Sequence, residues 1–205
     1  MSRLNTNIII AGVGGQGVVT AGTIISDAAS NAGLKVVMSE IHGLAQRGGS
    51  VTVDVRIGNV ESPMVPKGEA DLILGFEEIE TVRSLERGNR DTFVIMNLER
   101  LPPVSLGIRR REYPDEQEME RKTAGIANVH RIDANRIGRE AGNSKASGTA
   151  IIGAALSLGR LPFALSDVET ALRNQFSGKV LEVNLLALSK GFESIPGKEP
   201  TPANR

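Results

Sequence analysis

Residues 7–17 read Asn7-Ile8-Ile9-Ile10-Ala11-Gly12-Val13-Gly14-Gly15-Gln16-Gly17, so that a run of branched apolar residues changes abruptly into glycines. A continuous apolar run is typical of a strand that is covered on both faces, as in a parallel sheet. Residues 18–25 follow with small and apolar side chains at helical spacing. The stretch therefore predicts a buried strand, a tight turn and a helix.

The turn matches the pattern G-x-G-x-x-G at Gly12, Gly14 and Gly17. In this motif the first glycine permits the tight turn, the second lets a ligand approach the backbone, and the third lets the helix pack on the strand. An anion at the turn would meet free N–H groups and the positive end of the helix dipole. Two interpretations stay open, namely a strand–helix turn that binds nothing and a phosphate- or backbone-binding loop. That loop consists of Gly12, Gly14, Gly15, Gln16 and Gly17.

A second strand is predicted at residues 35–39, and it completes a Rossmann-like βαβ unit that leads to Glu40. A dinucleotide-binding fold has an acidic residue at the end of its second strand, which binds a ribose hydroxyl. Glu40 lies at about the expected distance along the chain, so an NAD or FAD site is one hypothesis from these features alone.

The rest of the chain alternates buried strands with helices. Strands are predicted at 70–76, 92–97 and 128–133, and a half-exposed antiparallel strand near a sheet edge at 50–57. Helices are predicted at 77–87, 134–140, 148–158, 166 onward and 180–191. The alternation predicts a three-layer α/β fold with a mostly parallel sheet and a helical C-terminal part.

Composition and the positions of proline and charged residues indicate the domain organisation. Prolines and charges at 98–122 predict an exposed excursion with a solvated helical turn at 115–122. We expect one domain over residues 1–195 and a flexible tail at 196–205.

Charge and residue usage exclude several classes of function. Lys+Arg and Asp+Glu balance at 24 each, and aromatic residues make up 3%, which argues against a nucleic-acid-binding surface. The chain has no Cys, so it cannot supply disulfides, a cysteine nucleophile or Cys-ligated clusters. We find neither a signal-peptide pattern nor an apolar run of membrane-spanning length, and we expect a cytoplasmic protein with no metal site of its own.

Glu40 also opens a concentrated polar segment, Glu40-Ile41-His42-Gly43-Leu44-Ala45-Gln46-Arg47-Gly48-Gly49-Ser50. Arg47 can form bidentate hydrogen bonds to a carboxylate or phosphate, and Gly48-Gly49 allows close backbone approach. His42 suits proton transfer or a hydrogen bond within the loop. The alternative is an ordered surface loop. The candidate contact residues are Glu40, His42, Gln46, Arg47, Gly48, Gly49 and Ser50.

Together, residues 12–18 and 39–51 resemble the gamma-type domain of thiamine-diphosphate-dependent 2-oxoacid:ferredoxin oxidoreductases. More closely, the chain is similar to the beta subunit of indolepyruvate:ferredoxin oxidoreductase, a separate chain of about this length. That subunit has the His-Gly and Ala-Gln-Arg-Gly-Gly form of the second loop, here at residues 42–43 and 45–49. The paired motifs cover about the first quarter of the chain, and the remainder agrees in length and order of elements.

The resemblance implies a complex that oxidatively decarboxylates an aryl pyruvate with coenzyme A, giving an aryl-acetyl-CoA, CO2 and reduced ferredoxin. A large alpha subunit would carry the thiamine diphosphate, its Mg²⁺ and the 4Fe-4S clusters. This chain lacks a Gly-Asp-Gly segment followed by Asn-Asn, and it fits a subunit that binds no cofactor alone. The resemblance places residues 12–17 and 40–50 at the interface with the alpha subunit, bordering its active site or the coenzyme A approach.

Two other functions stay open, a self-sufficient NAD(P)-dependent oxidoreductase and a coenzyme A or nucleotide-binding module. Three further features carry less weight. His130 is interpreted as structural, and residues 109–111, three arginines, as a solvated loop rather than a ferredoxin contact. Ser144 and Lys145 lack the strand-turn-helix setting of a hydrolase nucleophile.

Overall fold

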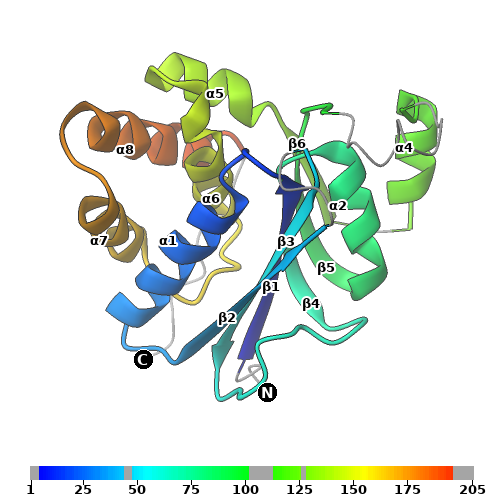
Figure 1. The fold of residues 1–205 in the computed structure, drawn as a ribbon, viewed down its shortest axis with the longest axis horizontal. Helices are drawn as coiled ribbons and strands as arrows, with labels where there is room; N and C mark the ends of the chain where they lie inside the picture. The colour runs from blue at the N-terminus through cyan, green and yellow to red at the C-terminus, as the bar shows by residue number, and fades with distance from the viewer. Residues whose placement is uncertain (1–4, 44–47, 102–112, 126–127, 196–205) are drawn as a thin grey trace.

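A six-stranded sheet forms the centre of the computed structural model, which describes residues 5–43, 48–101, 113–125 and 128–195 (Figure 1). Its strands have the order β2-β3-β1-β4-β5-β6. They span β1 Asn5–Val13, β2 Val36–His42, β3 Ser50–Gly58, β4 Ala70–Gly75, β5 Gly88–Asn97 and β6 Asn128–Ile132. β1, β4, β5 and β6 pair in parallel, whereas β3 is antiparallel to both β1 and β2. The predicted mostly parallel sheet is confirmed.

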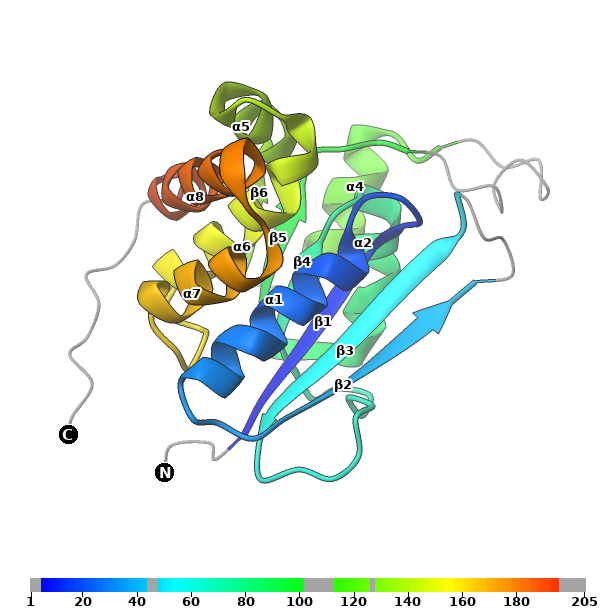
Figure 2. The ribbon, with the colours of Figure 1, turned by 60° about the vertical axis from the view of Figure 1, so that its left-hand side comes forward.

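Helices cover both faces of the sheet, which gives the predicted three layers (Figures 1 and 2). One face carries the larger set, α1 Val18–Asn31, α5 Ala134–Ala141, α6 Ser147–Ser157, α7 Leu165–Gln175 and α8 Gly178–Glu193. The other carries α2 Glu78–Ser84 and α4 Glu116–Thr123. Short 3-10 turns lie at Leu85–Arg87 and Ser144–Ala146.

The isoleucine run of β1 is apolar throughout because both of its faces are buried. Ile8 and Ile10 belong to the main core under α1 and α5–α8, and Ile9 belongs to a second cluster on the opposite face. All three are fully buried. Burial of one such side chain stabilises a fold by about 1.5–3 kcal/mol, so β1 anchors both layers.

The first βαβ unit is split by a third strand. β1, α1 and β2 follow in sequence, but β3 lies between β1 and β2 in the sheet. β2 is therefore an edge strand, and β3 is the predicted antiparallel strand near the edge. Because β2 continues to His42, Glu40 lies within the strand rather than at its end.

Three other expectations need correction. The predicted helix over 77–87 consists of α2 and a 3-10 turn, and β5 begins directly afterwards at Gly88 rather than at residue 92. α4 is more than a solvated turn, because Met119 is buried against Ile79 of α2. The predicted tail at 196–205 and most of the predicted excursion, 102–112, lie outside the described residues.

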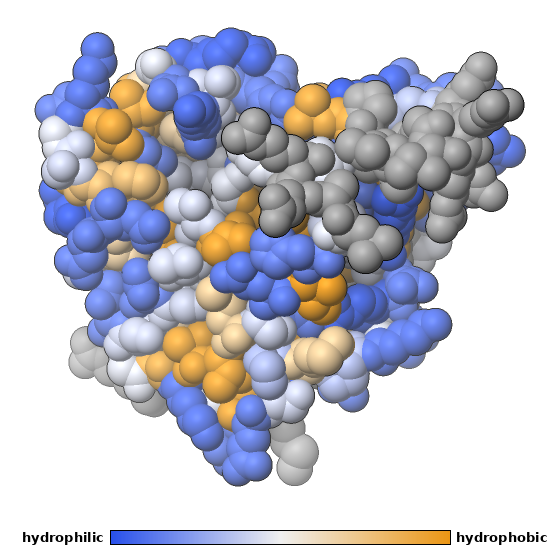
Figure 3. Space-filling model, in the orientation of Figure 1, coloured by the Kyte–Doolittle hydropathy of each residue, from blue (hydrophilic) through white to orange (hydrophobic). Residues whose placement is uncertain are grey.

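The surface seen from the side of Figure 1 is mostly hydrophilic, with apolar areas interrupted by polar side chains (Figure 3). Among the helices in the described part of the chain, none combines the length and apolarity needed to cross a membrane.

Candidate ligand and partner site

The glycine loop is a tight turn that its glycines make possible. The Gln16 N–H donates to the Val13 carbonyl over 3.1 Å, which closes the turn after β1. Gly15 and Gly17 have φ angles of 101° and 84°, in the left-handed region where other residues are strained. A Cβ atom on Gly12 would lie 2.8 Å from Gln16 Oε1. The turn therefore requires glycine at positions 15 and 17 for the backbone angle and at position 12 for space.

The second loop meets the glycine loop directly. The Gly14 N–H donates to the Gly49 carbonyl over 2.8 Å, and the ladder pairs Val13 with Ser50. The base of the second loop is closed by the Gly43 N–H, which donates to the Ser50 carbonyl over 2.7 Å. The structure therefore brings the two sequence motifs together where β1 ends and β3 begins.

Ser50 also links this edge to α2, because its Oγ donates to Glu80 Oε2 over 2.7 Å. Gly48 has a left-handed φ of 70°, which explains a glycine at that position. Gln46 and Arg47 lie outside the described residues.

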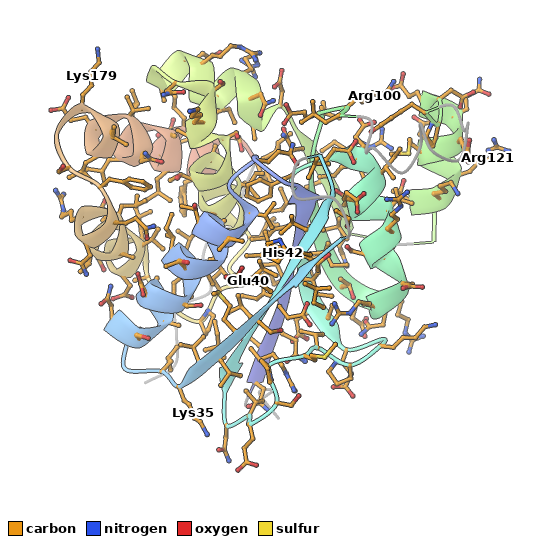
Figure 4. All side chains as sticks on the ribbon, in the orientation of Figure 1. Lys35, Glu40, His42, Arg100, Arg121 and Lys179 are labelled. Atoms are coloured by element: carbon orange, nitrogen blue, oxygen red, sulfur yellow. The ribbon has the colours of Figure 1, made fainter. Side chains whose placement is uncertain are left out.

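Glu40 and His42 form an exposed pair on β2. Their side-chain atoms Glu40 Oε2 and His42 Nε2 are 3.1 Å apart, and the side chains are 35% and 57% exposed. The register sets Glu40 beside Val53 and His42 beside Val51, so both project on the face that α1 covers (Figure 4).

This geometry argues against the dinucleotide hypothesis. β3 separates β2 from β1, so Glu40 lies two strand spacings, about 9–10 Å, from the strand that precedes the glycine loop. In a dinucleotide-binding fold that acid lies on the strand next to β1. The N–H of Gly14, the glycine that would approach a pyrophosphate, is already donated to Gly49.

A cavity of about 900 Å³ opens on the other side of the glycine loop. Three parts of the chain line it, namely the glycine loop with the start of α1, the connection between α5 and α6, and the start of α8. Its polar lining residues, from positions that the sequence did not single out as site residues, are Thr20, Glu99, Asn135, Asn143, Ser144, Lys145, Ser147, Thr149, Lys179 and Asn184.

Two helices, α1 and α8, begin at this cavity without a side-chain cap, whereas α6 continues the 3-10 turn at Ser144–Ala146, which the Asn143 side chain caps. α1 starts after Gly17 and α8 after Ser177, and neither residue accepts a capping hydrogen bond on its side chain. The first turns of all three helices contain no acidic residue. Free N–H groups and helix dipoles favour an anion, and Lys145 and Lys179 add positive charge.

Sequence reasoning missed this cavity because its walls come from distant segments. Ser144 and Lys145, whose sequence setting indicates no hydrolase nucleophile, both lie on the cavity wall. The α8 contribution has no motif at all.

A buried carboxylate lies beside the site. Glu77 is fully buried and accepts hydrogen bonds from the Glu80 N–H, the Leu101 N–H and the Tyr113 hydroxyl, at 3.0, 3.3 and 2.5 Å. Burial raises the pKa of Glu77 above its ordinary value. Burial, followed by the hydrogen bond to Glu77, raises the pKa of Tyr113. One oxygen, Glu77 Oε1, thus joins residues on both sides of 102–112.

The described residues contain no group of three or more His, Asp or Glu side chains placed to hold a metal ion. His130 stacks on Phe93, with ring centroids 6.4 Å apart, and burial lowers its pKa. This contact fits the structural role expected for His130.

Comparisons with known proteins agree on one family. The family model described as pyruvate ferredoxin/flavodoxin oxidoreductase matches residues 7–194. The indolepyruvate oxidoreductase subunit IorB of Archaeoglobus fulgidus is 37% identical over 197 residues, which cover 95% of this chain and 98% of that protein.

Two solved structures share the fold. The pyruvate oxidoreductase subunit PORC of Thermotoga maritima has a TM-score of 0.72 at 22% identity, covering 94% of this chain and 97% of that one. A 2-oxoglutarate:ferredoxin oxidoreductase from Magnetococcus marinus, solved with 2-oxoglutarate, coenzyme A and succinyl-CoA, also has a TM-score of 0.72, at 19% identity. This likeness covers 94% of the present chain but 31% of that longer chain.

The family match spans nearly the whole chain, and the IorB relative aligns over almost its full length. The protein therefore belongs to the pyruvate ferredoxin/flavodoxin oxidoreductase family and is a subunit of a 2-oxoacid:ferredoxin oxidoreductase.

Proposed function

We propose that this chain is the non-cofactor subunit of an oxidoreductase that acts on indolepyruvate or a related aryl pyruvate. The complex oxidatively decarboxylates the 2-oxoacid with coenzyme A to an aryl-acetyl-CoA and CO2, and the electrons pass to ferredoxin. The chain is inactive alone. The sequence supports the aryl branch through the His42-Gly43 and Ala45 to Gly49 form of the second loop, as does the 37% identity to an indolepyruvate oxidoreductase subunit.

The cofactors belong to a large partner subunit in this proposal. Cluster ligation requires cysteine thiolates, and this sequence contains no Cys. The 4Fe-4S clusters are therefore assigned to the alpha subunit. The family resemblance and the lack of a Gly-Asp-Gly segment followed by Asn-Asn assign thiamine diphosphate and its Mg²⁺ to the same subunit, where the thiamine supplies carbanion chemistry when bound. This chain contributes position and electrostatics.

The joined loops border the partner's active site. The observation that carries this assignment is the hydrogen bond from Gly14 to Gly49, because it makes the two family motifs one continuous surface. Glu40 and His42 project beside that surface and remain exposed in the isolated chain. We assign residues 12–17 and 40–50 to the contact with the alpha subunit.

The cavity next to the glycine loop suits the phosphate groups of coenzyme A. Ligand pockets commonly enclose about 300–1,000 Å³, and this one measures about 900 Å³. Two uncapped helix starts, those of α1 and α8, and two lysines offer N–H donors and positive charge to an anion. In this arrangement the chain would hold the phosphate end of coenzyme A while the thiol reaches the partner's active site.

The substrate assignment is tested with the complex co-expressed from both chains. Coenzyme A-dependent reduction of ferredoxin is measured with indolepyruvate, phenylpyruvate, pyruvate and 2-oxoglutarate as substrates. We expect the two aryl pyruvates to give the highest kcat/KM. Preference for pyruvate or 2-oxoglutarate would overturn the aryl assignment and leave the family membership unaffected.

A second candidate is a self-contained module that binds coenzyme A or a nucleotide, and the observation that favours it is the ligand-sized cavity of about 900 Å³ beside the glycine loop. Calorimetric titration of the isolated chain with coenzyme A distinguishes the two. Binding as tight as in the complex would support the module, whereas tight binding only with the partner supports the subunit function. Parallel titration with NAD(H) and NADP(H) tests the dinucleotide enzyme, for which we expect no binding.

A further inference from the structure

Gln16 connects the glycine loop to two neighbouring strand ends through its side chain. Its Oε1 accepts a hydrogen bond from the Val13 N–H over 2.7 Å. Its Nε2 donates to the Phe76 carbonyl over 3.1 Å and to Glu99 Oε2 over 2.8 Å. Val13 ends β1, Phe76 follows β4, and Glu99 lies just beyond β5. One amide therefore ties together the carboxyl ends of three parallel strands.

These contacts fix the orientation of the amide and use both of its donors. A primary amide carries two N–H groups, and here one points to a carbonyl and the other to a carboxylate. A flipped amide would set its NH2 group against the Val13 N–H and its oxygen against two acceptors. Although Gln16 lines the cavity, it has no donor left for an anionic ligand.

Neighbouring residues leave a space that Gln16 fills. Gly12 has no side chain, and a Cβ there would lie 2.8 Å both from Gln16 Oε1 and from Phe76 Cβ. Asn97 supports the same carbonyl, because its Nδ2 donates to Phe76 over 3.1 Å. The first glycine of the motif thus makes room for the glutamine as well as for the turn.

We propose that Gln16 is the positioning residue of the glycine loop. By holding Val13 and residue 16 in one turn, it sets the direction of the loop backbone and of the start of α1, where Gly17, Thr20 and Ala21 line the cavity. Through them it raises the affinity for a phosphate-bearing co-substrate that its own side chain does not bind. This inference rests on the proposed function, in which that co-substrate is coenzyme A.

Exchanging the amide and the carboxylate tests the proposal in the co-expressed complex. In Gln16→Glu a carboxylate replaces the NH2 group and faces Glu99 and the Phe76 carbonyl, so repulsion should displace the loop. We expect the KM for coenzyme A to rise about tenfold, while kcat changes less than about twofold. In Glu99→Gln the Gln16 amide keeps a neutral acceptor, and we expect a rise of no more than about threefold.

In the double variant Gln16→Glu/Glu99→Gln the amide at position 99 can donate to the carboxylate at position 16. The Phe76 carbonyl still accepts a hydrogen bond from Asn97 Nδ2. We expect this double variant to recover the KM for coenzyme A to within about threefold of wild type. Gln117→Glu makes the same chemical change on the exposed side of α4 and should leave both constants unchanged.

A pH series separates positioning from a general loss of structure. In Gln16→Glu the new carboxylate contacts that of Glu99, and two carboxylates in contact take up a proton at a higher pH than one alone does. That proton removes their repulsion, so lowering the pH should bring the KM of Gln16→Glu for coenzyme A back toward the wild-type value. If Gln16→Glu does not assemble, Gln16→Met removes the three hydrogen bonds without adding charge, and its KM should rise about fivefold.

Two outcomes would overturn the proposal. One is a wild-type KM for coenzyme A in Gln16→Glu or, where that variant does not assemble, in Gln16→Met. The other is a double variant as impaired as Gln16→Glu. Failure of the proposed function is recognised separately, since the wild-type complex would then show no dependence on coenzyme A.

Discussion

Asp54 on β3 is a fully buried charge with every oxygen engaged. It pairs with Arg87, whose Nη1 donates to Oδ1 over 2.8 Å and whose Nη2 donates to Oδ2, and it also accepts the Val65 N–H over 2.8 Å. These contacts hold the chain after β3 against the end of the 3-10 turn at Leu85–Arg87. Asp54 is thus a structural residue rather than a site residue.

Removal of this carboxylate should be costly. In Asp54→Ala the Arg87 guanidinium loses its partner in a mostly buried position, and we expect a loss of about 3–5 kcal/mol in the free energy of unfolding. Urea unfolding measures it. Arg136→Ala, which breaks an exposed pair with Glu140, is the control and should cost less than about 1 kcal/mol. Similar losses in the two variants would contradict the assignment.

Glu77 should make stability depend on pH. Because burial raises its pKa, the folded chain binds a proton more tightly than the unfolded chain does. The contribution of Glu77 to stability is therefore full below its ordinary pKa of 4.5 and falls as the pH rises toward the folded pKa. The unfolding free energy of wild type minus that of Glu77→Gln should fall as the pH rises above 4.5, because only the wild-type side chain loses a proton. A value that rises with pH would show that the pKa is lowered instead.

At the scale of elements, α6 and α8 are packed through two glycines. A Cβ on Gly153 would lie 2.2 Å from the Leu188 carbonyl oxygen, and one on Gly191 would lie 2.1 Å from the Ala150 carbonyl oxygen. Backbone atoms cannot yield as a flexible side chain does. The two helices therefore touch along their backbones, and this contact fixes how the start of α8 meets the cavity.

Gly153→Ala should separate these helices. We expect a loss of about 3 kcal/mol or more in thermal or urea unfolding, at the upper end of overpacking effects. Gly125→Ala is the matched control, since a Cβ there meets nothing within 4 Å, and its effect should stay below about 0.5 kcal/mol. Equal stability of the two variants would contradict the close helix packing.

The elements that sequence predicted well are those whose patterns are local. The isoleucine run of β1 and the terminating Gly142, with a φ of 119°, carry their structure in their own residues. The position of β3 between β1 and β2 is not local, because it depends on hydrogen bonds across the sheet. This insertion is what removed Glu40 from the place that a dinucleotide site requires.

The candidate site likewise has parts that the local sequence predicts and parts that depend on the packing of distant segments. The glycine spacing predicted the turn, and the two loops together indicated the family. The structure then placed the second loop beside the first through the hydrogen bond from Gly14 to Gly49. The contacts of Gln16 and the cavity wall were not predictable, because Phe76, Glu99 and Lys145 come from distant parts of the chain. Packing of whole elements brings them together.

At the scale of the molecule, the cavity lies at the carboxyl edge of the parallel strands, where three helices start. Lys145 lines it, and Lys35 lies near the opposite end of the molecule from Lys179 in Figure 4. We expect Lys145→Ala to raise the KM for coenzyme A in the complex by about three- to tenfold, because a charge-assisted contact is lost. Lys35→Ala should leave it unchanged. Equal effects would show that the lysine acts only through overall charge.

The central claim is that this chain works only as part of a larger oxidoreductase. The most direct measurement is indolepyruvate- and coenzyme A-dependent reduction of ferredoxin by the purified chain, by the separately purified partner to which we propose to assign the thiamine, and by the two combined. We predict turnover that requires both chains and a stable complex of the two. Full turnover by the partner alone, or nicotinamide-dependent turnover by this chain alone, would contradict the claim.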